Sequence, residues 1–219
     1  MNIFKTMKLA LCAGVVILAS GCATQKPYDY TAFKQSRPKT ILVLPPVNNS
    51  PDVNATYSML SHVTYPLAES GYYVLPVTLV DETFRQNGIM LPAEMHAVTP
   101  AKLREIFGAD AALYITIQQY GVTYMVVDSE ARVTAQANLV DLKTGKLLWS
   151  GSATASNNEG NNNSGGGVAG ILISAVVKQI VNNVTDAGHG VAGVTSQRLL
   201  FARPNGLLLG PRSPNYGKD

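Results

Sequence analysis

A cysteine at position 22 constrains this chain more than any other feature, because it ends a segment with the pattern of a secretory signal peptide. Two lysines, Lys5 and Lys8, precede an apolar stretch over residues 9–19, and small residues lead from there to the cysteine. This order of charge, apolar stretch and small residues is typical of a signal peptide. The apolar stretch has about 11 residues, whereas a helix needs about 20 to cross a bilayer. The sequence therefore predicts that residues 1–21 are removed and that the mature protein begins at Cys22.

The tetrad Ala19-Ser20-Gly21-Cys22 resembles the bacterial lipobox, with the departure that Leu18 lies four places before the cysteine instead of three. The resemblance implies a diacylglyceryl group on the Cys22 sulfur and, after cleavage, an acyl chain on its amine. Two or more acyl chains anchor a protein stably in a membrane. Ala23, and not Asp, follows the cysteine, which in similar Gram-negative lipoproteins favours the outer membrane and its periplasmic face. Exposure at the cell surface is left open, and the alternative is an ordinary cleaved signal with an incidental Cys22.

The predicted cleavage affects both disulfide formation and the net charge of the mature chain. Cys12 leaves with the signal and Cys22 is acylated, so no disulfide can form and a packed core must stabilise the domain. The full chain has 17 basic and 14 acidic residues, and the signal contains two of the basic ones. The near-neutral mature chain gives no electrostatic case for nucleic acid as a partner.

Residues 22–39 are expected to form a lipidated tether, because they are polar and lack both period-2 and helical periodicity. Three aromatic residues within it, Tyr28, Tyr30 and Phe33, either dock on the folded domain or sit at the membrane interface. Docking is the simpler expectation.

The folded domain is expected over residues 40–200, where apolar patterning alternates between strand and helix. In residues 40–45, β-branched and aliphatic side chains occupy the positions that point to either face of a strand. This is typical of a strand buried on both faces. Thr99, Pro100 and Gly108 give the strongest helix signals: an N-cap, a proline in the first turn and a terminal glycine. The expected strands are 40–45, 72–76, 111–119, 122–127, 131–142, 147–155 and 196–200, and the expected helices are 54–70, 78–86 and 99–108.

This order of elements predicts an α/β (α+β) fold: a single mixed-sheet domain with flanking helices. Residues 143–146 should close a hairpin. Segments 89–98 and 186–193 read as irregular, and residues 201–219 as an extended C-terminal tail.

An unusual pair of segments follows the hairpin. Residues 156–167 are almost all Asn, Ser and Gly, which predicts a flexible loop. Residues 168–184 are apolar but interrupted by polar residues, which argues against a membrane span. We expect a helix that closes the core; the alternatives are that it covers a partner subunit or enters the membrane surface.

We find no catalytic constellation in the sequence. Residues 165–170 match G-x-G-x-x-G, but a dinucleotide site needs a strand ending at the first glycine, and a long polar loop stands there instead. His62, His96 and His189 show no metal-ligand spacing, and the carboxylates are dispersed. Trp149 is expected to pack in the core, with interface anchoring as the alternative. The sequence therefore predicts neither an enzyme, nor a cofactor, nor a metal site.

Four stretches carry a resemblance to a known family. Residues 41–50 resemble the opening strand, and residues 140–150 the Asp-x-x-Thr-Gly hairpin, of envelope lipoproteins in the TolB amino-terminal and CsgG-like fold group. With the lipobox and residues 203–207, the whole chain is similar to the meningococcal candidate-antigen lipoprotein family of unknown function. The resemblance implies a TolB amino-terminal-domain-like fold and an accessory role beside a CsgG-like lipoprotein. It carries over no functional residue except the acylated Cys22.

The leading hypothesis is a non-enzymatic lipoprotein that faces the periplasm and binds another envelope protein, or further copies of itself, through residues 168–184 or an exposed sheet edge. A second hypothesis is a transport-auxiliary lipoprotein that binds a lipid or apolar ligand between helix and sheet. An enzyme is the third, and it would require a cleft that gathers His96 or His189 with carboxylates.

Overall fold

The computed structural model describes residues 28–124, 129–159, 187–202 and 204–218. Cys22, the 168–184 segment and most of the 156–167 loop lie outside these ranges. No helix within them is long and apolar enough to cross a membrane.

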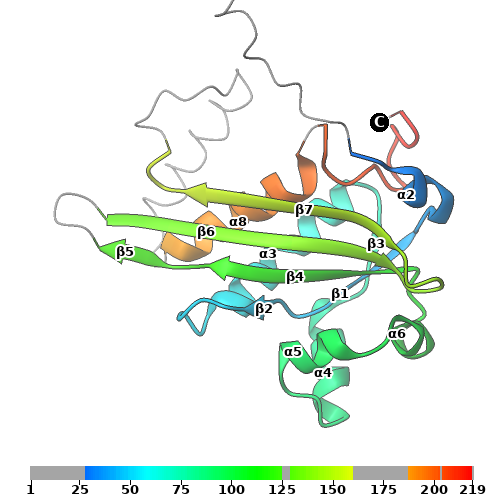
Figure 1. Ribbon diagram of the computed structural model, residues 1–219, viewed down its shortest axis with the longest axis horizontal. Helices are drawn as coiled ribbons and strands as arrows, with labels where there is room; N and C mark the ends of the chain where they lie inside the picture. Colours follow the sequence, from blue (N-terminus) through cyan, green and yellow to red (C-terminus); the bar gives the residue numbers. More distant parts are fainter. Residues whose placement is uncertain (1–27, 125–128, 160–186, 203, 219) are drawn as a thin grey trace, which may run out of the picture.

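A mixed sheet of seven strands organises the described part of the chain (Figure 1). Its main path runs β3-β1-β4-β6, and β7 pairs with the other side of β6. β1 is parallel to β3 and β4, whereas β4, β6 and β7 are antiparallel. The strands are β1 (Thr40–Val43), β2 (Val47–Asn48), β3 (Tyr73–Val74), β4 (Ala111–Gln119), β5 (Val122–Tyr124), β6 (Ser129–Asp141) and β7 (Leu147–Ser156).

Six helices are described around this sheet. They are α2 (Thr31–Ser36), α3 (Ala55–Glu69), α4 (Val77–Gln86), α5 (Pro92–Ala97), α6 (Pro100–Phe107) and α8 (Ala187–Phe201). α3 and α8 pack against each other, and α8 packs against β6 and β7 (Figure 1). The predicted mixed α/β domain with flanking helices is therefore confirmed.

Strand β1 explains how the helices divide between the two faces of the sheet. Ile41 and Val43 point into the core that contains residues of α3 and α8, whereas Leu42 and Leu44 point into a second core with residues of α4, α5 and α6. All four side chains are fully buried. The prediction of a strand buried on both faces is confirmed. The smaller helices cover only the β1 and β4 part of their face, and no helix of the described residues covers the outer face of β6 and β7 (Figure 1).

Most of the expected elements form where the sequence placed them. Thr99 caps α6 by accepting a hydrogen bond from the Lys102 N–H, and Gly108 ends that helix in the left-handed conformation. Asp141 and the turn at 143–146 close the β6–β7 hairpin.

Two segments that read as irregular are helical, and one expected strand is wrong. Residues 92–97 form α5, which begins with Pro92 and buries Met95. Residues 187–201 form the single helix α8, so neither the loop at 186–193 nor the strand at 196–200 exists. One glycine of this segment, Gly193, permits close packing of α8 on α3. A Cβ atom at Gly193 would lie 3.2 Å from the His62 ring on α3.

Both ends of the described chain pack on the domain, which corrects two further expectations. Residues 28–39 are not a free tether, because α2 buries Phe33 and the Tyr30 hydroxyl donates to the Gly206 carbonyl. The expected docking of the aromatic residues is confirmed. The C-terminal segment has no regular strand or helix in its described part beyond α8, but it buries Leu207 and Leu208 and so belongs to the domain.

Candidate functional site

The outer face of β4, β6 and β7 forms a trough of about 950 Å³, which we call the sheet trough. Its floor consists of side chains that the antiparallel register places in two rows across the three strands. Directly opposed residues in such rows lie about 5 Å apart, and the rows are separated by two residues, or about 7 Å. The first row is Tyr114, Asn138 and Ser150, and the second is Thr116, Gln136 and Ser152.

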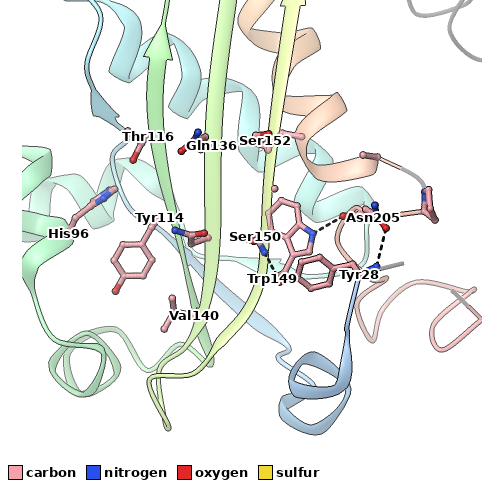
Figure 2. Close-up of a pocket in the computed structure, with 15 residues that line it drawn as sticks. Tyr28, His96, Tyr114, Thr116, Gln136, Val140, Trp149, Ser150, Ser152 and Asn205 are labelled. Carbon is pink, nitrogen blue, oxygen red and sulfur yellow. Dashed lines mark hydrogen bonds between the residues drawn. The ribbon is translucent and has the colours of Figure 1, made fainter. Parts of the chain in front are cut away.

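Aromatic residues stand on both sides of this floor (Figure 2). On one side the His96 ring meets the Tyr114 ring edge-on at 5.2 Å, and His96 Nε2 lies 3.0 Å from the Pro45 carbonyl oxygen. On the other side lie Tyr28, Trp149 and Asn205. The trough is thus bounded by the second core on one side and by the docked chain ends on the other.

Hydrogen bonds hold the second side in place. Trp149 Nε1 donates to the Asn205 carbonyl oxygen at 2.9 Å, and the Tyr28 N–H donates to Asn205 Oδ1 at 3.3 Å. The Ser150 N–H donates to the Tyr28 hydroxyl oxygen at 3.0 Å. Trp149 is fully buried, which confirms the expectation that it packs in the core.

The lining of the sheet trough carries no Lys, Arg, Asp or Glu among the described residues. Burial favours the neutral form of two lining groups, His96 and Tyr114. Burial lowers the pKa of His96 and outweighs its hydrogen bond with the Pro45 carbonyl, which acts in the opposite direction. Burial also raises the pKa of the Tyr114 hydroxyl. Both shifts favour the uncharged form near neutral pH.

Five side chains on the floor have unused hydrogen-bonding capacity. Within the described part of the chain, they make no side-chain hydrogen bond, whereas the next pair along the same strands, Thr134 and Thr154, bond to each other at 3.0 Å. Gln136, Asn138 and Ser152 are exposed. The five are Thr116, Gln136, Asn138, Ser150 and Ser152.

A second polar cluster lies between α3, α8 and the end of β4, and brings together two histidines that are far apart in the sequence. The His62 and His189 rings lie 4.3 Å apart. His189 Nδ1 and Ser58 Oγ are 2.8 Å apart, and the Tyr120 hydroxyl donates to Ser58 Oγ at 2.8 Å. The pKa of His62 is lowered, chiefly by burial and then by its electrostatic interaction with His189. A backbone hydrogen bond with His189 acts in the opposite direction.

Within the described part of the chain, this cluster has no side chain recognisable as an accessible nucleophile. Ser58 is only 8% exposed, so its hydroxyl is largely closed to a substrate in solution. No group of three His, Cys, Asp or Glu residues that could hold a metal ion lies within the described ranges. The neighbours of His96 described above are the Tyr114 ring and the Pro45 carbonyl oxygen, and neither is a carboxylate. The glycine motif at 165–170 lies outside the described residues.

Sequence reasoning missed the sheet trough because alternating polar residues are ordinary on a half-exposed strand. The available signal was that β4, β6 and β7 all present neutral Thr, Gln, Asn or Ser at positions that pair in register. That signal can be read only when the register is known. Sequence reasoning also missed the contact between His62 and His189, because His189 was expected to lie in a loop.

Comparison with known proteins assigns the chain to a family. The family model described as "Putative lipoprotein GNA1162-like" matches residues 28–212. The curated protein named "Putative lipoprotein NMB1124/NMB1162", from Neisseria meningitidis serogroup B (strain ATCC BAA-335 / MC58), is 51% identical over 207 residues, which cover 93% of this chain and 95% of the relative.

A solved structure agrees with this assignment. The crystal structure of lipoprotein GNA1162 from Neisseria meningitidis is 55% identical, with a TM-score of 0.55, and the match covers 67% of this chain and all of that one. The matched family model spans the sheet trough and both docked ends of the domain. This chain therefore belongs to the GNA1162-like lipoprotein family.

Proposed function

We propose that this chain is a non-enzymatic accessory or assembly component of an envelope complex, anchored in the outer membrane through acylated Cys22 and facing the periplasm. Its proposed protein partner is a CsgG-like lipoprotein, with self-association as an additional contact. Membership in a lipoprotein family implies membrane anchoring. The observation that carries the proposal is the sheet trough: a large, open and uncharged surface suited to binding, with no nucleophile and base in contact among its described lining residues.

The docked N-terminal segment supports a position close to the membrane. Tyr28 is already fixed to the domain through Ser150 and Asn205, so only residues 23–27 separate it from Cys22. Six residue steps span at most about 20 Å. The proposed anchor therefore holds the domain near the bilayer instead of extending it far into the periplasm.

A Cys22→Ala variant tests the anchor. The wild-type chain is expected to incorporate labelled palmitate and to fractionate with outer membranes, whereas Cys22→Ala loses both properties. A Cys12→Ala variant is the matched control, since that cysteine lies in the predicted signal peptide and should leave acylation unchanged. Equal palmitate labelling of wild type and Cys22→Ala would contradict the proposed anchor.

The accessory role is tested in crosslinked envelopes. The full-length tagged chain is expected to copurify a CsgG-like lipoprotein, identified by mass spectrometry, and Cys22→Ala should lower its recovery because the two proteins no longer share a membrane. Recovery of no such partner above the level of an unrelated tagged lipoprotein would refute this part of the proposal.

A second candidate function has a specific observation in its favour. A recess of about 410 Å³ lies between α2 and the C-terminal segment, with apolar walls that include Phe33 and Leu209 and with Lys34 and Arg37 among its lining residues. Such a recess suits an acidic apolar ligand, in line with a transport-auxiliary lipoprotein. Native mass spectrometry of the full chain should then show a ligand that Leu209→Gln loses. A ligand-free wild-type chain would reject this function.

A further inference from the structure

We propose that the sheet trough binds a neutral glycan. The inference deepens the proposed function and rests on it, since it names the ligand class of the surface that carries that proposal. It starts from the chemistry of the floor, where Thr116, Gln136, Asn138 and Ser152 offer both donors and acceptors without partners in the described part of the chain. Such a mixed set matches hydroxyl groups, each of which donates and accepts.

The charge of the trough selects against other ligands. A phosphate or carboxylate would need a cation, and an ammonium group would need an anion, but the described lining provides neither. A wholly apolar ligand would leave the floor amides and hydroxyls desolvated and without hydrogen bonds, which is unfavourable. A ligand that is uncharged and rich in hydroxyl groups satisfies both conditions.

The aromatic sides suit the same ligand. A pyranose ring presents polar edges and apolar C–H faces, and aromatic side chains give large contact areas to such faces. Tyr114 and Tyr28 stand on opposite sides of the floor (Figure 2). Floor side chains on neighbouring strands lie about 5 Å apart, and the two rows lie about 7 Å apart along the strands. These spacings are similar to the repeat of successive sugar units in an oligosaccharide.

An extended peptide is the main competitor, and the structure disfavours its usual mode of binding. A peptide that adds to a sheet pairs with the backbone of an edge strand. On the outer edge of β7, the Ser150 N–H already donates to the Tyr28 hydroxyl and Arg198 Nη1 donates to the Thr154 carbonyl at 2.9 Å. These contacts occupy two of the β7 backbone groups that a peptide would need, whereas the floor side chains make no hydrogen bond within the described part of the chain.

The only tryptophan of the chain reports on this site, because Trp149 lines the trough. The experiment uses the full-length acylated protein in lauryldimethylamine oxide micelles, a detergent without a sugar head group. Chitotetraose and maltotetraose are titrated while Trp149 fluorescence and the heat of binding are measured. Saturable binding of either oligosaccharide is expected.

Two variants and a matched control locate the binding. Gln136→Ala and Asn138→Ala each remove an exposed amide and should weaken binding about five- to tenfold, the loss expected for one hydrogen bond. Gln35→Ala removes an exposed amide from α2, outside the trough lining, and should leave affinity unchanged.

Three results would overturn the glycan proposal. The first is that neither oligosaccharide binds saturably. The second is that Gln136→Ala and Gln35→Ala bind the oligosaccharide with equal affinity. The third is that the neutral peptide acetyl-Gly-Ser-Gly-Ser-amide binds saturably while no sugar binds. Copurification of a CsgG-like lipoprotein in crosslinked envelopes is measured separately. If it persists while sugar binding fails, the glycan inference is wrong and the accessory function stands.

Discussion

Gly151 has no side chain, and this leaves room for the large side chain of Trp149. Trp149 lies on β7 and its ring extends over Gly151, where a Cβ atom would come within 2.4 Å of the indole. The indole cannot move away easily, because it is fully buried and its Nε1 donates to the Asn205 carbonyl oxygen. The glycine is therefore required for the tryptophan to reach the C-terminal segment.

We expect Gly151→Ala to destabilise the protein by about 1–3 kcal/mol, the usual cost of inserting a methyl group into a filled site. The measurement is urea unfolding followed by far-UV circular dichroism. Ser152→Ala, at the exposed neighbouring position, is the control and should change stability by less than about 0.5 kcal/mol. A Gly151→Ala variant as stable as that control would show that the indole moves aside freely.

The histidine pair makes stability depend on pH. His62 is held neutral in the folded protein because burial, and then the charge of His189, lower its pKa, and its buried Nε2 has no hydrogen-bond partner in the described part of the chain. In the unfolded chain the same group protonates near its ordinary value of 6.5. Below that pH the unfolded state binds more protons, so stability falls as the pH decreases.

A His62→Phe variant is expected to lose less stability between pH 7.5 and 5.5 than the wild type. The phenyl ring retains the packing against Gly193 and removes the group that titrates. One such group contributes at most about 1.4 kcal/mol per pH unit. The measurement is the urea midpoint at both pH values. His96, whose pKa is also lowered by burial, stays in both proteins and gives them a common background. Equal losses in the two proteins would contradict the role of His62.

Among the elements, the β6–β7 hairpin depends on one carboxylate at the end of β6. Asp141 Oδ1 accepts hydrogen bonds from the backbone N–H groups of Lys143 and Thr144 at 2.9 and 2.7 Å. Its Oδ2 accepts a hydrogen bond from the Ser36 hydroxyl, which joins the end of α2 to the hairpin. Burial acts to raise the pKa of Asp141, but these hydrogen bonds prevail and the pKa is lowered.

Asp141→Ala is expected to destabilise the protein by about 2–3 kcal/mol, because it leaves several donors without their charged acceptor. Urea unfolding at pH 7 measures the loss. Since the folded-state pKa of Asp141 is lowered, its contribution is present above the unfolded value of 3.8 and is lost as the pH falls through the lower folded value. Lys146→Ala, on the same turn, is the control and should be close to neutral. A similar effect of both substitutions would argue against the carboxylate as the cap.

Helix α8 shows how a neighbouring element overrides local sequence preference. Gly188, Gly190 and Gly193 give it poor intrinsic helix propensity, by about 1 kcal/mol per glycine relative to alanine. Its packing against α3, β6 and β7 supplies the stabilisation that the helix lacks by itself. One of these glycines, Gly193, brings the helix close to His62.

At the scale of the whole molecule, the two ends of the described chain meet beside β7. The Tyr30 hydroxyl donates to the Gly206 carbonyl oxygen, and Tyr28 bonds Asn205 through its backbone N–H. Phe33, on α2, is only 4% exposed and belongs to the main core. The chain ends are therefore part of the domain, and they form one side of the sheet trough (Figure 2).

Phe33→Ala is expected to destabilise the domain by about 3–5 kcal/mol, the usual cost of removing a buried phenyl ring. It should also release the N-terminal segment, so that limited proteolysis cleaves near α2 before the rest of the domain. Lys34→Ala, the exposed neighbour, is the control for both measurements. An unchanged cleavage pattern in Phe33→Ala would show that the segment docks without its phenylalanine.

The sequence by itself determined the elements whose signals are local. The apolar run of β1, the cap and terminal glycine of α6, and the turn of the β6–β7 hairpin depend on residues within a few positions of one another, so their chemistry can be read along the chain. The lipobox at Cys22 is local in the same sense and stays a prediction. These signals were sufficient for the mixed α/β fold class.

Only the tertiary structure decided which distant residues meet. Strand register and helix packing determine four features of this protein: the helix α8, the docking of the chain ends, the contact of His62 with His189, and the two rows of the sheet trough. The free energies involved come from contacts between segments that are not neighbours in the sequence, which local propensity does not contain. The sequence could therefore identify an anchored α/β domain, whereas the surface it offers for binding emerged from the packing.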